Sequence, residues 1–362
     1  METINWENHF DLGFAEECEL PWLLLNRHFP SKIGGKPAWL DLENFPTYNE
    51  MKCPVCKEPR VLLCQIYCPI DEKEECFHRT IFVFVCKTES CYQENSSENI
   101  LVLRSQLRRH NEYYPYEPPD ENIELPELNC FKSLCSVCGC HGPLLCSRCK
   151  GITYCSSTHQ RADWKYHKQI CRGETASSTN KTTKHTVFPE LQMVIEPEEL
   201  TFDEPEQSET EEEAEKRRLR EYEELQKSGK VGEFKDISDE ELAKYAGSDI
   251  QDKQFKLFKK TIQSEPEQVL RYRRKGKPLW ITTKEPTLQD IIPNCERCDS
   301  ERCFEFQIMP QMLNYIKDDN IDWGVIAVYT CVNSCSIKGY AKEFCIKQDI
   351  ISKPNDSITK TE

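Results

Sequence analysis

Eight cysteine and histidine side chains fall within one short stretch and have the spacing of metal ligands. They are Cys135, Cys138, Cys146, Cys149, Cys155, His159, His167 and Cys171. A C-x-x-C turn places two thiolates on one ion, and a helical i, i+4 pair places two side chains on one helix face. Four such pairs predict two tetrahedral Zn²⁺ ions. Because so short a stretch buries little apolar surface, we expect metal binding to drive its folding.

The residues between these positions resemble the MYND-type zinc finger. The matching residues are Tyr154-Cys155-Ser156, Gln160, Trp164 and His167-Lys168. The resemblance implies cross-braced ligation, with one site made by Cys135, Cys138, Cys155 and His159 and the other by Cys146, Cys149, His167 and Cys171. His159 stands where the family more often has Cys, and imidazole is an ordinary zinc ligand.

Two questions about the finger stay open at the level of sequence. Cys140 stands beside Cys138, so one of the two thiols can be assigned wrongly. MYND fingers are similar to peptide-binding modules, which implies Pro-rich peptides as partners and places Trp164 near the groove. A purely structural scaffold is the alternative.

The chain also repeats itself on either side of the finger. Gly35-Lys36-Pro37-Ala38-Trp39-Leu40 returns as Gly276-Lys277-Pro278-Leu279-Trp280-Ile281. A C-x-x-C, an Arg, a Gln-Ile pair, an apolar strand ending in Cys and one more Cys follow in both copies. Matches in the same order favour a duplicated β-rich module.

The duplication separates candidate ligands from other thiols. Cysteines present in both copies predict two further zinc knuckles, made by Cys53, Cys56, Cys86 and Cys91 and by Cys295, Cys298, Cys331 and Cys335. Their alternative is that all eight are core residues. Cys64, Cys68 and Cys303 each correspond to another residue type in the opposite copy, so we expect packed thiols there. We therefore expect Zn²⁺ as the cofactor, two ions in the finger and two more if the knuckles bind metal.

Composition narrows the function classes. The formal net charge is −15 and 22 residues are Cys. The negative charge argues against direct nucleic-acid binding and favours a basic partner. No apolar run reaches the roughly 20 residues of a membrane span, and the N-terminus lacks a signal-peptide pattern. Abundant cysteine without a secretory signal indicates metal in a reducing compartment, so we expect the cytoplasm and nucleus.

The fold expectation is an α+β, β-rich protein in which the finger and an acidic segment interrupt the duplicated module. We divide it into a first module (1–129), the finger (130–173), a linker (174–187), a strand followed by an acidic and helical segment (188–265), and a second module (266–362). Within 188–265 we expect a strand at 188–195, an acidic and partly disordered block at 196–215, a capping box at Ser238 and an amphipathic helix through Phe255, Phe258 and Ile262.

The whole chain resembles the programmed cell death protein 2 family. The resemblance rests on the finger and on segments 12–14, 29–40, 113–119, 267–272, 306–315 and 321–324. It implies a chaperone or adaptor that binds a basic small-subunit ribosomal protein, the universal S5 type, and supports 40S ribosome biogenesis. An acidic chain could shield such a client by replacing phosphate charge, with the duplicated body as its groove.

Three other functions can be compared with this one. An enzyme is disfavoured, because motifs such as G-x-S-x-G and H-E-x-x-H are absent and every expected zinc site has four protein ligands. A DNA-binding regulator would use the basic cluster at 271–277. A transcriptional adaptor controlling proliferation or apoptosis would act through the finger.

Overall fold

The computed structural model describes residues 9–126, 128–171, 186–198, 253–282 and 292–350. Ten strands close into one barrel in the order β1-β8-β2-β3-β4-β5-β12-β11-β10-β9, and β9 returns to β1. They are β1 (Asp11–Glu16), β2 (Lys32–Ile33), β3 (Val61–Tyr67), β4 (His78–Val85), β5 (Ile100–Leu107), β8 (Leu191–Pro197), β9 (Leu270–Tyr272), β10 (Arg302–Ile308), β11 (Val325–Cys331) and β12 (Tyr340–Gln348). The β-rich prediction is confirmed.

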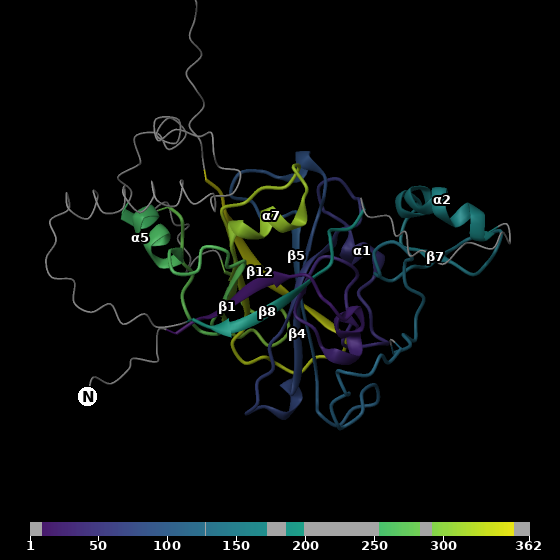
Figure 1. Ribbon diagram of the computed structural model, residues 1–362, viewed down its shortest axis with the longest axis horizontal. Helices are drawn as coiled ribbons and strands as arrows, with labels where there is room; N and C mark the ends of the chain where they lie inside the picture. Colours follow the sequence, from purple (N-terminus) through teal and green to yellow (C-terminus); the bar gives the residue numbers. More distant parts are fainter. Residues whose placement is uncertain (1–8, 127, 172–185, 199–252, 283–291, 351–362) are drawn as a thin grey trace, which may run out of the picture.

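The remaining elements are short or lie outside the barrel. They are α1 (Tyr48–Met51), α2 (Ser157–Cys171), α5 (Lys253–Ile262) and α7 (Leu313–Ile316), the 3-10 turns η2 (Pro21–Leu24), η3 (Asn26–His28), η4 (Glu74–Cys76), η5 (Glu89–Cys91) and η7 (Pro310–Met312), and the hairpin β6 (Leu144–Leu145) and β7 (Thr153–Tyr154). Figure 1 shows α2 and α5 on opposite sides of the barrel. No helix in the described ranges is long and apolar enough to cross a membrane.

The barrel contains the same series of strands twice, once in each direction around it. The duplicated sequence therefore folds as two halves of one barrel. The run β2-β3-β4-β5 in one copy corresponds to β9-β10-β11-β12 in the other, and the copies meet where β5 pairs with β12 and where β1 pairs with β8. In both copies the pairing register shifts at the same place, between Leu62 and Cys64 in β3 and between Phe304 and Phe306 in β10. The sequence left open whether the halves form one body, and the closed sheet answers it.

The repeated glutamine explains why the Gly-Lys-Pro-x-Trp element recurs. The Gln65 side chain accepts a hydrogen bond from the Ala38 amide at 2.8 Å, and Gln307 accepts one from the Leu279 amide at 2.5 Å. Each buried amide group therefore fixes the loop that carries the tryptophan to the neighbouring strand. Gln65 and Gln307 are both almost fully buried, where an unpaired amide group would be costly.

Charged side chains from opposite copies meet inside the barrel. Arg79 on β4 makes two hydrogen bonds to Glu305 on β10, at 2.8 and 2.9 Å, and both side chains have no exposed area. The Tyr272 hydroxyl also donates to Glu305. Because removing one partner would leave a buried charge unpaired, this pair makes the two halves depend on each other.

Several sequence expectations about single elements can be compared with the structure. The amphipathic helix is confirmed as α5, whose Phe255, Phe258 and Ile262 pack on the second copy. The strand expected at 188–195 is β8, which begins later because Pro189 has no amide hydrogen for a ladder. The capping box at Ser238 and most of the acidic block 196–215 lie outside the described residues. The five segment boundaries stay predictions.

Candidate zinc centres and pocket

The first group of the finger is buried where the finger packs against the barrel. Cys135, Cys138, Cys155 and His159 are all buried, and their ligand atoms lie within 4.8 Å of one another. The Nδ1 atom of His159 is 3.1 Å from the Cys155 sulfur and 3.6 Å from that of Cys135. The three cysteines belong to the same hydrophobic cluster as Trp39 of the barrel. The expected set is therefore brought together, and Cys140 lies outside it.

Trp39 makes the contact that fixes the finger to the barrel. Its indole N–H donates to the Gly139 carbonyl at 2.7 Å, at a buried position. Gly139 has φ +71°, and a Cβ there would lie 2.8 Å from Cβ of Lys36. Only glycine fits this close approach without strain.

The second group of the finger lies in a more exposed setting. It brings together Cys146, Cys149, His167 and Cys171, with Cys149 exposed and Cys171 half-buried. The Nε2 atom of His167 is 3.2 Å from the Cys146 sulfur and 3.5 Å from that of Cys149. Helix α2 supplies His167 and Cys171 one turn apart, as the i, i+4 spacing predicts.

The two flanking knuckles also assemble as the duplication predicts. Each of the sets Cys53, Cys56, Cys86, Cys91 and Cys295, Cys298, Cys331, Cys335 has its four sulfurs within 4.8 Å of one another. Sulfur atoms within these sets lie 3.4 Å apart for Cys56 and Cys86, 3.8 Å for Cys295 and Cys335, and 3.5 Å for Cys298 and Cys331. A tetrahedron with Zn–S bonds of about 2.3 Å has edges of about 3.8 Å. The Cys295–Cys335 separation equals this edge, and the other two are shorter.

One arginine secures each knuckle in the same way. Arg60 donates to the carbonyls of Lys52 at 2.7 Å and Asn99 at 3.1 Å. Arg302 donates to those of Asn294 at 2.6 Å and Lys342 at 3.2 Å. Lys52 and Asn294 each precede the first cysteine of their knuckle, so the repeated arginine holds the metal-binding turn against the neighbouring strand.

The donor sets fit zinc and leave no coordination position for substrate. Every group offers four protein donors, either all thiolate or three thiolates with one imidazole, which is the chemistry of structural zinc sites. The residues that the structure describes thus form four groups able to bind zinc, two of them in the finger. Their closed donor sets suit stabilisation of the fold.

The thiols expected to be packed are buried among the strands. Cys64 is fully buried, and burial raises the pKa of its thiol. Burial also raises the pKa of Cys68 to about 12. Both are therefore protonated at neutral pH and act as small apolar side chains. Cys303 is half-buried.

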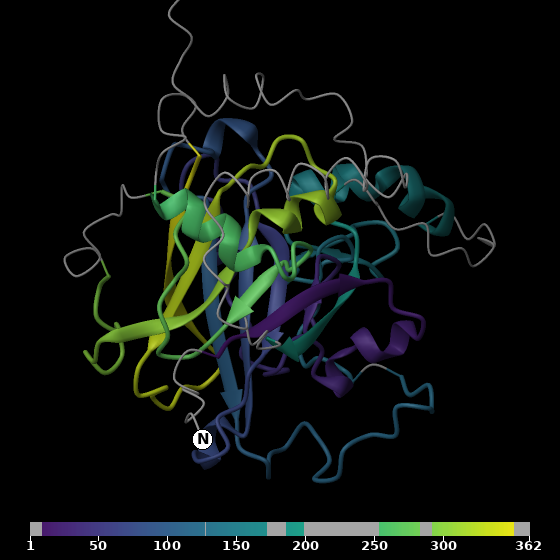
Figure 2. The ribbon, with the colours of Figure 1, turned by 60° about the vertical axis from the view of Figure 1, so that its left-hand side comes forward.

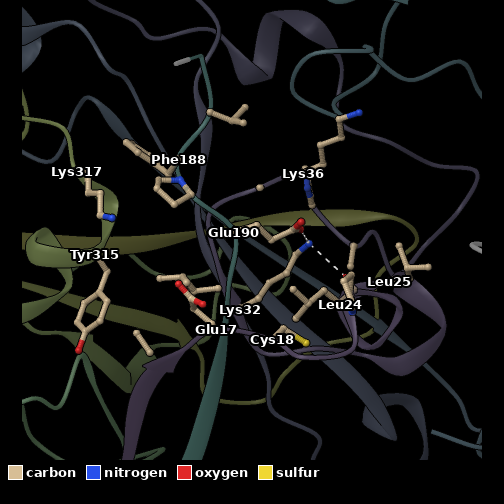
Figure 3. A pocket seen from close by; sticks show the side chains of 18 residues that line it. Glu17, Cys18, Leu24, Leu25, Lys32, Lys36, Phe188, Glu190, Tyr315 and Lys317 are labelled. Atoms are coloured by element: carbon tan, nitrogen blue, oxygen red, sulfur yellow. Dashed lines mark hydrogen bonds and ion pairs between the residues drawn. The ribbon is translucent and has the colours of Figure 1, made fainter. Parts of the chain in front are cut away.

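A pocket that sequence reasoning did not find opens beside β1, β2 and β8. Its volume is about 1020 Å³, and most of its lining is apolar, including Leu24, Leu25 and Phe188. Lys32 and Glu190 meet in its middle with an ion-pair distance of 2.6 Å, and Lys36 and Lys317 stand on opposite sides (Figure 3). The only signal in the sequence was the repeated Gly-Lys-Pro element, which forms one wall.

The basic cluster at 271–277 is largely used within the fold. Arg271 is buried and pairs with Glu198 at 2.9 Å. Arg274 donates to the carbonyls of Cys331 and Val332 at 3.2 and 2.8 Å. Arg273 also donates to the His9 carbonyl, so all three arginines of the cluster make contacts within the fold, and the exposed Lys275 and Lys277 remain at its surface.

A closed barrel of two copies, each with a cysteine knuckle, and a docked finger define a zinc-binding protein of the MYND-finger class. Family models for the N-terminal and C-terminal domains of programmed cell death protein 2 match residues 9–121 and 252–349, and a MYND finger model matches 135–171. The chain is 41% identical over 354 residues to programmed cell death protein 2 of Bos taurus, which covers 94% of this chain and 96% of that protein. The chain belongs to the programmed cell death protein 2 family.

More distant relatives extend the comparison. Programmed cell death protein 2-like of Homo sapiens is 26% identical over 345 residues, covering 88% of this chain and 90% of that protein. The protein named probable 20S rRNA accumulation protein 4 of Schizosaccharomyces pombe is 33% identical over 97 residues, 24% of each chain. No solved structure matches the chain.

Proposed function

We propose that the protein is a non-enzymatic chaperone that binds a basic small-subunit ribosomal protein, of the universal S5 type, and supports ribosome biogenesis. The observation that carries this proposal is the apolar pocket of about 1020 Å³ in a barrel whose chain has a net charge of −15. A preformed concave apolar surface suits an extended segment of a client, and the net negative charge of the whole chain favours a basic partner. The name of the fission yeast relative refers to ribosomal RNA, which supports a role in ribosome biogenesis.

The sixteen side chains of the four groups are our proposed zinc ligands, and their role is to hold the client-binding body in shape. The finger is a protein-interaction module, and Pro-rich peptides are its proposed ligands. Thiolate ligands need a reducing environment, so we place the protein in the cytoplasm and nucleus.

Co-expression with the S5-type ribosomal protein tests the proposal. We expect the client to remain soluble in a complex of one chain with one client, measured by size exclusion and mass spectrometry. Leu25→Arg places a charge in the pocket, and Leu257→Arg makes the same change on the exposed face of α5. We expect only the pocket variant to lose the client.

Two results would count against different parts of the proposal. A wild-type chain that forms no complex with the ribosomal protein would reject the client. A complex unaffected by Leu25→Arg would keep the client and reject the pocket as its site.

A further inference from the structure

The C-terminal knuckle is joined to the first copy of the module by an arginine. Arg104 lies on β5, in the first copy, and its side chain has no exposed area. Its guanidinium donates to the Cys335 carbonyl at 3.1 Å and approaches the Cys335 sulfur at 3.6 Å. Cys335 belongs to the second copy, so this contact crosses the seam where β5 pairs with β12.

A buried carboxylate extends the contact to a second cysteine of the same knuckle. Glu343 accepts from Arg104 Nε at 2.7 Å through one oxygen. Its other oxygen accepts from Arg302 Nε at 3.0 Å and from the Cys331 amide at 3.1 Å. One network of charged groups therefore positions Cys331, Cys335 and the arginine that secures the knuckle.

The N-terminal knuckle shows a related but weaker arrangement. Ile66 pairs with Ile81, which pairs with Arg104, and Ile308 pairs with Ile326, which pairs with Lys347. Lys347 is thus the counterpart of Arg104.

Lys347 also crosses the seam toward the opposite knuckle. Its ammonium lies 5.6 Å from the ring centre of Tyr92, and the Tyr92 hydroxyl donates to the Cys86 carbonyl at 2.8 Å. Each copy therefore sends a buried cation toward the knuckle of the other. Only Arg104 reaches a ligand residue directly.

The charge of a loaded knuckle explains why a cation belongs there. Four thiolates around one Zn²⁺ leave a net charge of about −2, and a buried negative charge is costly without a partner. Side chains that hydrogen-bond to metal ligands hold those ligands in orientation, and loss of such a side chain weakens metal binding about 10- to 100-fold.

We propose that Arg104 is a positioning residue for the C-terminal zinc knuckle, so that zinc binding there and closure of the β5–β12 seam depend on each other. The first copy completes the metal site of the second. Because coupling between two equilibria is reciprocal, removing zinc loosens the seam and opening the seam releases zinc.

The test follows zinc loss and seam opening in the intact chain. Arg104→Met is treated with a chelator, and the zinc ions retained are counted over time by native mass spectrometry. We expect one of the zinc ions to leave about tenfold faster than in the wild type. Arg108→Met is the matched control, because Arg108 follows β5 and forms only exposed ion pairs with Glu74 and Glu75.

A second measurement works in the opposite direction and covers the case in which Arg104→Met does not fold. Cys298→Ser removes one ligand of the C-terminal knuckle without touching Arg104. In Cys298→Ser we expect amide hydrogen exchange to rise in β5, across the seam. In Arg104→Lys, which keeps the positive charge, we expect zinc to be released at a rate between those of the wild type and Arg104→Met. Zinc release from Arg104→Lys at the wild-type rate, or unchanged exchange in β5 of Cys298→Ser, would overturn the proposal.

Discussion

The two zinc groups of the finger share one helix but differ in what surrounds them. The first group lies in the hydrophobic cluster that it shares with the barrel. The Trp39 indole donates a hydrogen bond to the carbonyl of Gly139, which directly follows the ligand Cys138. The second group has an exposed ligand, Cys149, and lies near the exposed Trp164. Figure 2 shows that α2, which serves both groups, extends away from the barrel.

This difference separates two roles within one finger. Metal in the first group supports a wall of the pocket, because Gly139 lies against Lys36 and Pro37, which line it. Metal in the second group shapes the outer surface that a partner can reach. Ligand spacing is similar in the two groups, so the spacing alone does not reveal which ion supports the rest of the protein.

The largest expected effect comes from removing a ligand of the first group. Cys138→Ser should lower the free energy of unfolding of the whole barrel by at least about 4 kcal/mol, since it disrupts a structural metal site within a core. Cys149→Ser is the matched change in the second group and should leave the barrel transition nearly unchanged. Thermal unfolding followed by near-UV circular dichroism measures both. Equal losses would remove the distinction between the groups.

A smaller effect tests the junction without touching a ligand. Gly139→Ala combines a strained positive φ with a contact of 2.8 Å to Lys36, so we expect a loss of about 3 kcal/mol. At Gly151 an added Cβ would lie 3.8 Å from the carbonyl oxygen of Cys149, so Gly151→Ala should change stability by less than about 0.5 kcal/mol. Denaturant unfolding of the two variants compares the inner and outer parts of the finger. A similar small change in both would show that the junction is loose.

The sequence predicted which cysteine and histidine side chains the structure brings together, and it predicted the barrel that holds them only in part. Ligands of a knuckle are few residues apart or recur in both copies, so spacing and duplication identify them. The pairing of β1 with β8 joins residues far apart in sequence, and no local pattern encodes it. The finger's junction joins Trp39 to a backbone carbonyl, that of Gly139, about a hundred residues away in sequence, so no local pattern predicts that the two meet.

A pH-dependent effect separates the two copies of the barrel. His78 is buried against Phe29, and burial, aided by the charge of Arg109, lowers its pKa to about 4. The unfolded chain binds this proton near pH 6.5 and the folded chain does not, so stability falls as pH drops from about 6.5 toward 4. A pKa change of one corresponds to about 1.4 kcal/mol, and partial solvent screening reduces the effect, so we expect a loss of roughly 2 kcal/mol.

The second copy supplies the comparison for this histidine. Counting back equally from Ile81 and Ile326, its place is taken by the non-titrating Trp323. His78→Gln should therefore remove this part of the acid sensitivity and keep the part due to zinc release. Urea unfolding between pH 4 and 7 measures the difference. Parallel curves for the variant and the wild type would contradict the assignment to His78.

The smallest effect on stability is expected at the outer face of the finger. Trp164 is 44% exposed, so Trp164→Ala should change the barrel's free energy of unfolding by less than about 0.5 kcal/mol. It should abolish binding of Pro-rich peptides at the finger, measured by fluorescence anisotropy. Peptide binding that survives the change would place the peptide elsewhere.

A zinc count on the intact chain tests the central claim most directly. Native mass spectrometry of protein purified under reducing conditions should show four zinc ions per chain, one for each group of four donors. Such a count would establish that both copies of the barrel, as well as the finger, bind zinc. Two zinc ions per chain would contradict the account, because the eight flanking cysteines would then be ordinary core residues.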